Sequence, residues 1–174
     1  VLTGVGLHRA PTAYYAVIAA DGDRMGEYIT NACKDQKAHR ELSLDLERWA
    51  TSCREMVEDH LGSCIYAGGD DVLALLPLHT ALECARMLAD SFQATMFKLA
   101  RKVPPEQRPT LSVGIGISHH MQPMRDALDL ARRAERLAKS VPGKNALALC
   151  LAKRSGPGLE VAAPWTAALD IRIK

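Results

Sequence analysis

The chain has 174 residues, of which 48% are hydrophobic and 24% are charged, a composition typical of one globular domain with a sizeable core. Its formal net charge of +2 is too small to indicate a nucleic-acid-binding surface by itself. No apolar run approaches the ~20 residues that span a bilayer, and no signal peptide is evident. We therefore expect a cytoplasmic protein without membrane contact and, because the chain opens on Val1, a piece of a longer protein.

Hydrophobic periodicity predicts elements in the order β-α-α-β-β-α-β-α-β. They are a strand at 13–20, helices at 24–33 and 42–60, hairpin strands at 63–67 and 72–77, a helix from about 80 to 101, a strand at 110–118, a helix at 124–140 and a strand at 146–152. Thr80 and Glu83 have the spacing of a capping box. Gly114 and Gly116 leave one strand face bare, so we expect another element to pack closely there.

This order contains the split β-α-β-β-α-β plan, an antiparallel sheet with helices on one face. We predict an α+β fold, a ferredoxin-like palm with an extra helix that is similar to nucleotide cyclases. The palm spans 13–152, between a lead-in at 1–12 and a C-terminal extension at 153–174 that we expect to form an edge strand or a contact arm. Many domains with this plan have no enzymatic role.

The cysteines are five in number and widely spaced, and no C-x-x-C pair occurs. Neither a zinc site nor a disulfide framework is therefore expected. We expect free buried thiols, as in a reducing cytoplasm. They are Cys33, Cys53, Cys64, Cys84 and Cys150.

Two acidic turns follow apolar strands. Asp21 ends the first strand, while Asp70 and Asp71 lie at the hairpin turn. Because the first strand and the hairpin are neighbours in the predicted sheet, we expect the three carboxylates to converge at one edge. With a backbone carbonyl such as that of Gly22 and phosphate oxygens of a substrate, they suit Mg²⁺ or Mn²⁺, and two such ions can activate a hydroxyl and stabilise a leaving pyrophosphate. A single Asp-Asp turn is more often merely solvated; the second acidic turn favours a metal site.

Neighbouring glycines and backbone predict a nucleotide site. Gly68 and Gly69 permit positive φ and a close approach of the backbone to a ribose or phosphate. The N–H groups of residues 22–26, at the start of a helix, form a candidate triphosphate site. The nucleotide-binding candidates in this stretch are Gly22, Asp23, Arg24 and Met25.

Other polar residues have two interpretations each. Asp23 could bind metal or cap the helix that follows it. Lys139 and Lys144 could balance the charge of a triphosphate, although lysines at a helix end also complement its dipole. His119 and His120 follow a strand and are more readily explained as structural or as contacts to a neighbour than as a general base.

Four motifs occur in order along the chain: AADGDRMGEYI, YAGGDDVLALLPL, LSVGIGISHH and RAERLAKSVPGKNAL. Together they resemble the second palm domain of the large polymerase-like subunit of type III CRISPR effector complexes, Cmr type. The resemblance covers roughly residues 13–156. The same motifs show a wider kinship to diguanylate cyclases, which carry GGDEF hairpins.

The resemblance implies a palm that binds ATP and, with Mg²⁺ or Mn²⁺, joins ATP into cyclic oligoadenylates, the second messengers of an antiviral defence. The family's metal-binding acidic residues match Asp21, Asp70 and Asp71, and its phosphate-binding positions match the backbone after Asp21 together with Lys139 and Lys144. It also implies a second palm domain, from the same full-length chain or a homodimer, as well as effector subunits and guide and target RNA. An isolated palm is expected to be weak or inactive.

Alternatives remain open. Diguanylate cyclases place a guanine-reading Asn where this chain has Ile29, and an apolar side chain cannot pair with the guanine edge, which favours adenine. Asn31, two residues further on, is a weak argument to the contrary. The chain could also be a non-catalytic scaffold palm contacting guide RNA and neighbouring subunits, or a standalone minimal CRISPR-type polymerase making cyclic dinucleotides as a homodimer.

Overall fold

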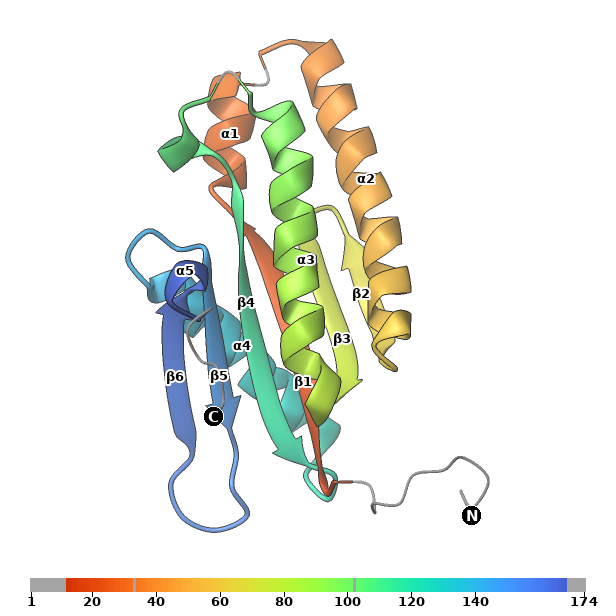
Figure 1. Ribbon diagram of the computed structural model, residues 1–174, viewed down its shortest axis with the longest axis vertical. Helices are drawn as coiled ribbons and strands as arrows, with labels where there is room; N and C mark the ends of the chain where they lie inside the picture. The colour runs from red at the N-terminus through yellow and green to blue at the C-terminus, as the bar shows by residue number, and fades with distance from the viewer. Residues whose placement is uncertain (1–11, 33, 102, 169–174) are drawn as a thin grey trace.

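A computed structural model of the protein describes residues 12–32, 34–101 and 103–168 (Figure 1). The elements are β1 (Tyr14–Asp23), α1 (Met25–Ala32), α2 (Gln36–Asp59), β2 (Ser63–Gly68), β3 (Asp71–Pro77), α3 (Leu78–Leu99), a 3₁₀ turn (Pro105–Gln107), β4 (Thr110–His119), α4 (Met124–Ser140), β5 (Ala146–Leu151), β6 (Leu159–Pro164) and α5 (Trp165–Ala168). One six-stranded sheet has the order β2-β3-β1-β4-β5-β6. Cys33 and most of the predicted lead-in lie outside the described residues.

The sheet confirms the predicted α+β palm. β1 lies between β3 and β4 and pairs antiparallel with both, so the first strand and the hairpin are neighbours, as expected. The prediction of an antiparallel sheet is wrong at one place, because β4 and β5 are parallel. A parallel pair needs a crossover connection, and α4 provides it.

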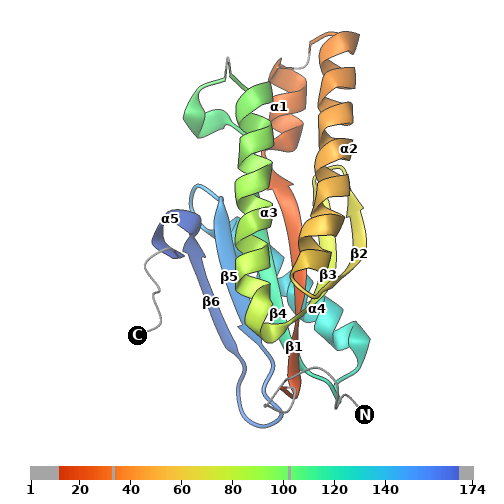
Figure 2. The ribbon, with the colours of Figure 1, turned by 45° about the vertical axis from the view of Figure 1, so that its right-hand side comes forward.

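Helices cover both faces of the sheet (Figures 1 and 2). The expected single helical layer holds for α2 and α3 and is wrong for α4, which packs on the opposite face. Successive side chains of β1 point to opposite faces of the sheet, which explains this arrangement. Ile18 belongs to the main core with α2 and α3, whereas Val17 and Ala19 pack against α4. Phe92 and Leu88 of α3 are fully buried in the main core.

The close packing expected beside Gly114 and Gly116 is confirmed, and the packing element is α4. A Cβ added to Gly114 would lie 2.0 Å from the backbone nitrogen of Glu135, and one added to Gly116 would lie 2.6 Å from that of Ala131. The helix contributes small residues to this contact, and its fully buried side chains are Ala127, Ala131, Ala134 and Ala138. The bare strand therefore fixes the height of α4 above the sheet.

Two helix starts differ from expectation. α2 begins at Gln36 rather than 42, because the Asp35 side chain accepts a hydrogen bond from Ala38 N at 2.7 Å and caps the helix. α3 begins at Leu78, directly after Pro77, so the predicted Thr80 cap is wrong. The Thr80 hydroxyl instead donates to the His60 carbonyl at 2.7 Å and ties the end of α2 to the start of α3.

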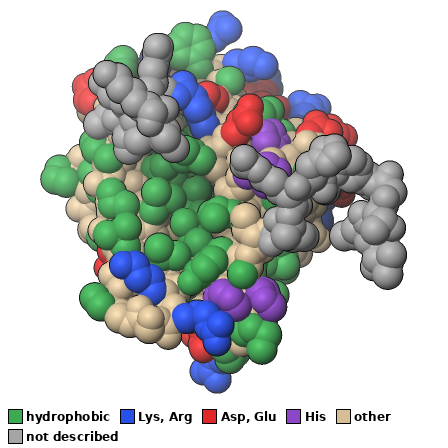
Figure 3. All heavy atoms as spheres, turned by 60° about the horizontal axis from the view of Figure 1, so that its bottom comes forward, with side chains coloured by type: hydrophobic (Ala, Val, Ile, Leu, Met, Phe, Trp, Pro, Cys, Tyr) green, Lys and Arg blue, Asp and Glu red, His purple; other side chains and the backbone are tan. Residues whose placement is uncertain are grey.

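Part of the C-terminal extension forms the edge strand β6, which pairs antiparallel with β5. Trp165, just after it, donates from its indole N–H to the Leu111 carbonyl at 3.1 Å. Leu149 of β5 packs against the main core on the α3 side of the sheet. Val161 is paired with it on the same face, and Leu159 and Val161 are 55% and 42% exposed. Figure 3, in which the lower end of the molecule in Figure 1 is turned forward, shows hydrophobic side chains gathered near the middle of the view.

The four cysteines that the structure describes are free, as predicted, although one of them is only partly buried. Cys53, Cys84 and Cys150 are free and buried, and Cys64 is free and partly buried. No helix in the described ranges combines the length and the apolar character needed to cross a membrane.

Candidate nucleotide and metal site

The acidic end of β1 meets the hairpin turn. Pairing of β1 with β3 runs to Ala20 opposite Val72, so Asp21 and Asp71 occupy the next opposite positions. Residues directly opposite in antiparallel strands lie about 5 Å apart at Cα. The Asp70 carboxylate lies beside Gly22, and the backbone N–H of Gly22 acts to lower its pKa. The structure thus brings both acidic segments to one edge of the sheet.

Gly22 is in contact with Asp70. A Cβ at Gly22 would lie 2.5 Å from an Asp70 carboxylate oxygen, so only glycine leaves room for that side chain. Within the turn, Gly69 has φ +61°, whereas Gly68 is not left-handed, so the expected positive φ is present at one of the two glycines. A positive φ at the first of two loop residues is the pattern of a type II′ hairpin.

Burial raises the pKa values of both acids of the hairpin. Burial raises the pKa of Asp70, and the Asp71 charge adds to the shift, while backbone hydrogen bonds from Asp70 itself and from Gly22 oppose it. Partial burial also raises the pKa of Asp71, the more exposed of the two. A cation between them and Asp21 would relieve this repulsion.

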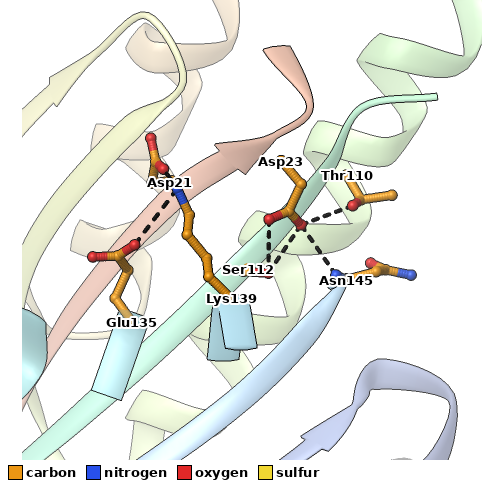
Figure 4. A network of polar contacts seen from close by, with 7 residues as sticks. All are labelled: Asp21, Asp23, Thr110, Ser112, Glu135, Lys139 and Asn145. Carbon is orange, nitrogen blue, oxygen red and sulfur yellow. Dashed lines mark hydrogen bonds and ion pairs between the residues drawn. The ribbon is translucent and has the colours of Figure 1, made fainter. Parts of the chain in front are cut away.

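Lys139 supplies one positive charge at this edge (Figure 4). Its ammonium is ion-paired with Asp21 and lies 3.6 Å from a carboxylate oxygen of Glu135, one turn earlier on α4. Burial lowers the pKa of Lys139, and the nearby charge of Lys144 adds to the shift. Glu135 was not predicted from the sequence; its position four residues before Lys139, on the same helix face, was the available signal.

Asp23 has a different environment from Asp21. Its side chain is 1% exposed and accepts hydrogen bonds from the hydroxyls of Thr110 (2.8 Å) and Ser112 (2.9 Å) and from the N–H of Asn145 (3.0 Å). Figure 4 shows these contacts converging on one carboxylate. They lead to β4 and to the start of β5, not to α1, so the predicted helix cap is wrong.

The other candidates after Asp21 are also engaged in contacts. Arg24 is left-handed at φ 59°, and its guanidinium donates to the Gly143 carbonyl at 2.8 Å. Met25 is 8% exposed in the main core. Since the Asp70 carboxylate lies against Gly22, the backbone N–H groups that can face a phosphate begin after it.

A hollow of ≈ 430 Å³ opens beside the glycines of the hairpin. It lies between α2 and the turn, and this volume is within the range of small-molecule sites. Its lining residues are Ser43, Leu46, Glu47, Ala50, Thr51, Arg54, Ala67, Gly68 and Gly69. Ile29 of α1 packs against the main core, and Asn31 is exposed.

Protein side chains alone do not build a metal centre here. Across the residues that the structure describes, no group of three or more His, Cys, Asp or Glu is arranged to hold an ion. Mg²⁺ usually keeps several waters and binds through one or two carboxylates plus substrate phosphates. Asp21, Asp71 and the Gly22 carbonyl offer that smaller oxygen set, which fits a metal–nucleotide better than a metal ion alone.

The histidine pair lies at the opposite end of the sheet. His119 pairs with Tyr14, seven residues before Asp21 on β1, which places it about 20 Å from the acidic edge. The His119 and His120 rings stack at 4.6 Å, and Tyr14 contacts the His119 ring edge-on at 5.1 Å. Neither histidine is near the candidate site.

The central β1, the acidic hairpin beside its end and the helices α2 and α3 that cover one face of the sheet define a palm domain of the nucleotide-cyclase type. The family model described as "Cas10/Cmr2, second palm domain" matches residues 14–148. The chain therefore belongs to the family of Cas10/Cmr2 second palm domains.

Relatives agree with this membership. The CRISPR system Cmr subunit Cmr2 of Pyrococcus furiosus is 36% identical over 172 residues, which cover 84% of this chain and 19% of that protein. A Csm1–Csm4 cassette in complex with cA4 matches with a TM-score of 0.68 at 19% identity, over 92% of this chain and 24% of that chain. The GGEEF domain of a diguanylate cyclase from Vibrio cholerae matches with a TM-score of 0.55 at 20% identity, over 82% and 85%. The chain spans about a fifth of the curated relative.

Proposed function

We propose that this palm binds ATP with a divalent metal ion and acts as a nucleotidyltransferase that makes cyclic oligoadenylates in type III CRISPR defence. The observation that carries the proposal is the close approach of the Asp70 carboxylate to Gly22, which brings the hairpin against β1 beside Asp21. Csm1–Csm4 cassettes of the same fold have been solved with one ATP, with pppApA and with cA4, which supports an adenine nucleotide as the ligand.

The acidic edge would hold the metal ion. Asp21, Asp71 and the Gly22 carbonyl are the proposed ligands, and Asp70 joins them or orients the turn through its contact with Gly22. Bound Mg²⁺ or Mn²⁺ would supply charge neutralisation at the phosphates and a lowered pKa of an attacking 3′-hydroxyl. The chain's own contribution is to crowd carboxylates whose repulsion a cation relieves.

The triphosphate would lie along the backbone after Asp21, where N–H groups at the start of α1 meet the lysines of α4 and its following turn. Lys139, now paired with Asp21 and Glu135, has phosphate oxygens as an alternative partner once a metal ion balances Asp21. Lys144 adds charge beside it. Gly68 and Gly69 leave room for the nucleotide between the turn and α2.

Adenine is the proposed base. Ile29 packs its apolar side chain against the core and offers no hydrogen bond to a guanine edge. An unpaired polar edge buried against protein is costly, so ATP is favoured over GTP.

Two nucleotides must face each other for a bond to form, and one palm presents one nucleotide. We therefore propose a second palm as partner, from a longer chain or from a second copy, and effector subunits with guide and target RNA as the larger assembly. The family membership supports this, because the Cmr2 relative is about five times longer than the matched region.

Mass spectrometry of products after incubation with ATP and Mn²⁺ tests the proposal. With a second palm present, from the longer chain or from a second copy, we expect adenylate oligomers from the wild-type protein and none from the Asp70→Ala/Asp71→Ala variant. Asp90→Ala, which removes an exposed acid on α3, should keep the wild-type yield. Synthesis retained without Asp70 and Asp71 would refute the assignment. A wild-type chain that does not bind ATP with Mn²⁺ would favour the scaffold alternative.

A further inference from the structure

The turn between α4 and β5 has an unusual backbone. Gly143, Lys144 and Asn145 are consecutively left-handed, with φ of 87°, 56° and 49°. Residues other than glycine hold such a conformation only where the surrounding structure over-determines it. Within the turn, the Lys144 N–H donates to the Val141 carbonyl at 2.8 Å. The remaining support comes from outside the turn.

That support comes mainly from two adjacent residues at the end of β1. Asp23 accepts the Asn145 N–H at 3.0 Å, and Arg24 donates to the Gly143 carbonyl at 2.8 Å. Trp165 N donates to the Asn145 carbonyl at 3.0 Å from the other side. The left-handed turn is therefore fixed at both Gly143 and Asn145 by the strand that carries Asp21.

Asp23 is itself immobilised. The hydroxyls of Thr110 and Ser112 hold both of its carboxylate oxygens, and the side chain is 1% exposed. Turning Asp23 toward a ligand would leave the buried Ser112 hydroxyl and two partly buried donors without their acceptor, which is costly. Its geometry suits a fixed support and does not suit a ligand of a nucleotide or a metal ion.

We propose that Asp23 and Arg24 are positioning residues that hold the lysines of α4 and its following turn against the acidic end of β1. They fix the turn that carries Lys144, and with it the last turn of α4, where Lys139 meets Asp21. The expected effect on nucleotide binding rests on the proposed function. The expected effect on the conformation of the turn does not.

Asparagine and alanine at position 23 separate positioning from ligation. The Asn carbonyl can accept from Asn145 and Thr110 while its amide donates to the Ser112 hydroxyl, so Asp23→Asn keeps every contact. Asp23→Ala loses them all. A carboxylate that ligates a metal ion would fail in both variants, because the amide carries no charge.

The experiment combines amide hydrogen exchange of residues 143–146 with calorimetric titration of ATP and Mn²⁺ on the same samples. In Asp23→Ala we expect faster exchange in this turn and ATP affinity reduced by about tenfold, the scale of lost buried hydrogen bonds. In Asp23→Asn we expect both to stay within about twofold of wild type. Asp90→Asn and Asp90→Ala serve as matched controls, because Asp90 is an exposed acid on the surface of α3.

Two results would overturn the inference. Unchanged exchange at 143–146 in Asp23→Ala shows that the turn does not depend on Asp23. Lost Mn²⁺-dependent ATP binding in Asp23→Asn with wild-type exchange makes Asp23 a ligand. If Asp23→Ala does not fold, Thr110→Val, which removes one donor and keeps the shape, must give the same pattern at smaller amplitude. Faster exchange in a chain that never binds ATP supports the positioning and refutes only the proposed function.

Discussion

Replacing Gly114 by alanine tests how closely α4 must approach the sheet. The added Cβ would lie 2.0 Å from the Glu135 nitrogen and 2.5 Å from the Ala134 carbonyl carbon, both of them backbone atoms. Non-bonded contacts settle near 3.5–4.0 Å, so the helix would have to retreat by more than about 1 Å. Neither β4 nor α4 can turn a flexible side chain aside to avoid this.

The cost follows from overpacking. Forcing one extra methyl into a packed core costs about 1–3 kcal/mol. We expect the upper end of this range because the added Cβ would meet backbone atoms of α4, which cannot rotate away. For a domain of this size, about 3 kcal/mol corresponds to a fall in Tm of roughly 6–12 °C. Because Glu135 and Lys139 move with α4, the affinity for ATP with Mn²⁺ should fall as well.

Urea unfolding of Gly114→Ala against wild type measures the effect. Gly26→Ala is the matched control, because nothing lies within 4 Å of its added Cβ and the position is in α1. There we expect a gain of up to about 1 kcal/mol from helix propensity. A Gly114→Ala protein as stable as wild type would refute the close contact between α4 and β4.

Three further outcomes are expected. Burial raises the pKa of Glu135 above its ordinary 4.5. Above that pH the folded state therefore binds more protons than the unfolded state, so the free energy of unfolding of the wild type falls as the pH rises. The stabilisation by Glu135→Gln should accordingly grow from pH 4 to pH 7 in urea titrations, and a gain that shrinks contradicts it. Burial raises the pKa of Cys53 to about 12, so iodoacetamide at pH 8 should modify Cys64 well before Cys53 by mass spectrometry, and equal rates would be inconsistent. Lys139→Met should weaken the binding of ATP with Mn²⁺, measured by calorimetry, by about tenfold because a charge-assisted contact is lost. Lys37→Met, which removes only an exposed i,i+4 ion pair, should leave the affinity unchanged. Equal losses in the two variants would count against a specific role of Lys139 in nucleotide binding.

Features set by local sequence were predictable. The apolar run before Asp21 and the two glycines of the hairpin located β1, its neighbouring turn and the acidic edge. The strand face left bare by Gly114 and Gly116 predicted that another element packs closely there. These signals depend on two-residue alternation and turn chemistry, which act within a few residues of the site.

Features set by tertiary packing were not predictable. Nothing in the periodicity of α4 says which face of the sheet it covers; the alternation of Val17 and Ile18 decides that only once α2 and α3 occupy one side. The role of Asp23 depends on donors 87 and 122 residues away, Thr110 and Asn145. Leu78 starts α3 ahead of Thr80 because Pro77 fixes the entry, which overrides the capping-box pattern.

Calorimetric titration of ATP with Mn²⁺ into wild type, Asp21→Asn and Asp71→Asn tests most directly whether the two acidic segments form one metal–nucleotide site. We expect binding by wild type and at least about a tenfold loss in each variant, because each carboxylate would supply a charge-assisted contact to the same ion. Wild-type affinity in Asp21→Asn, with loss confined to Asp71→Asn, would contradict a shared site.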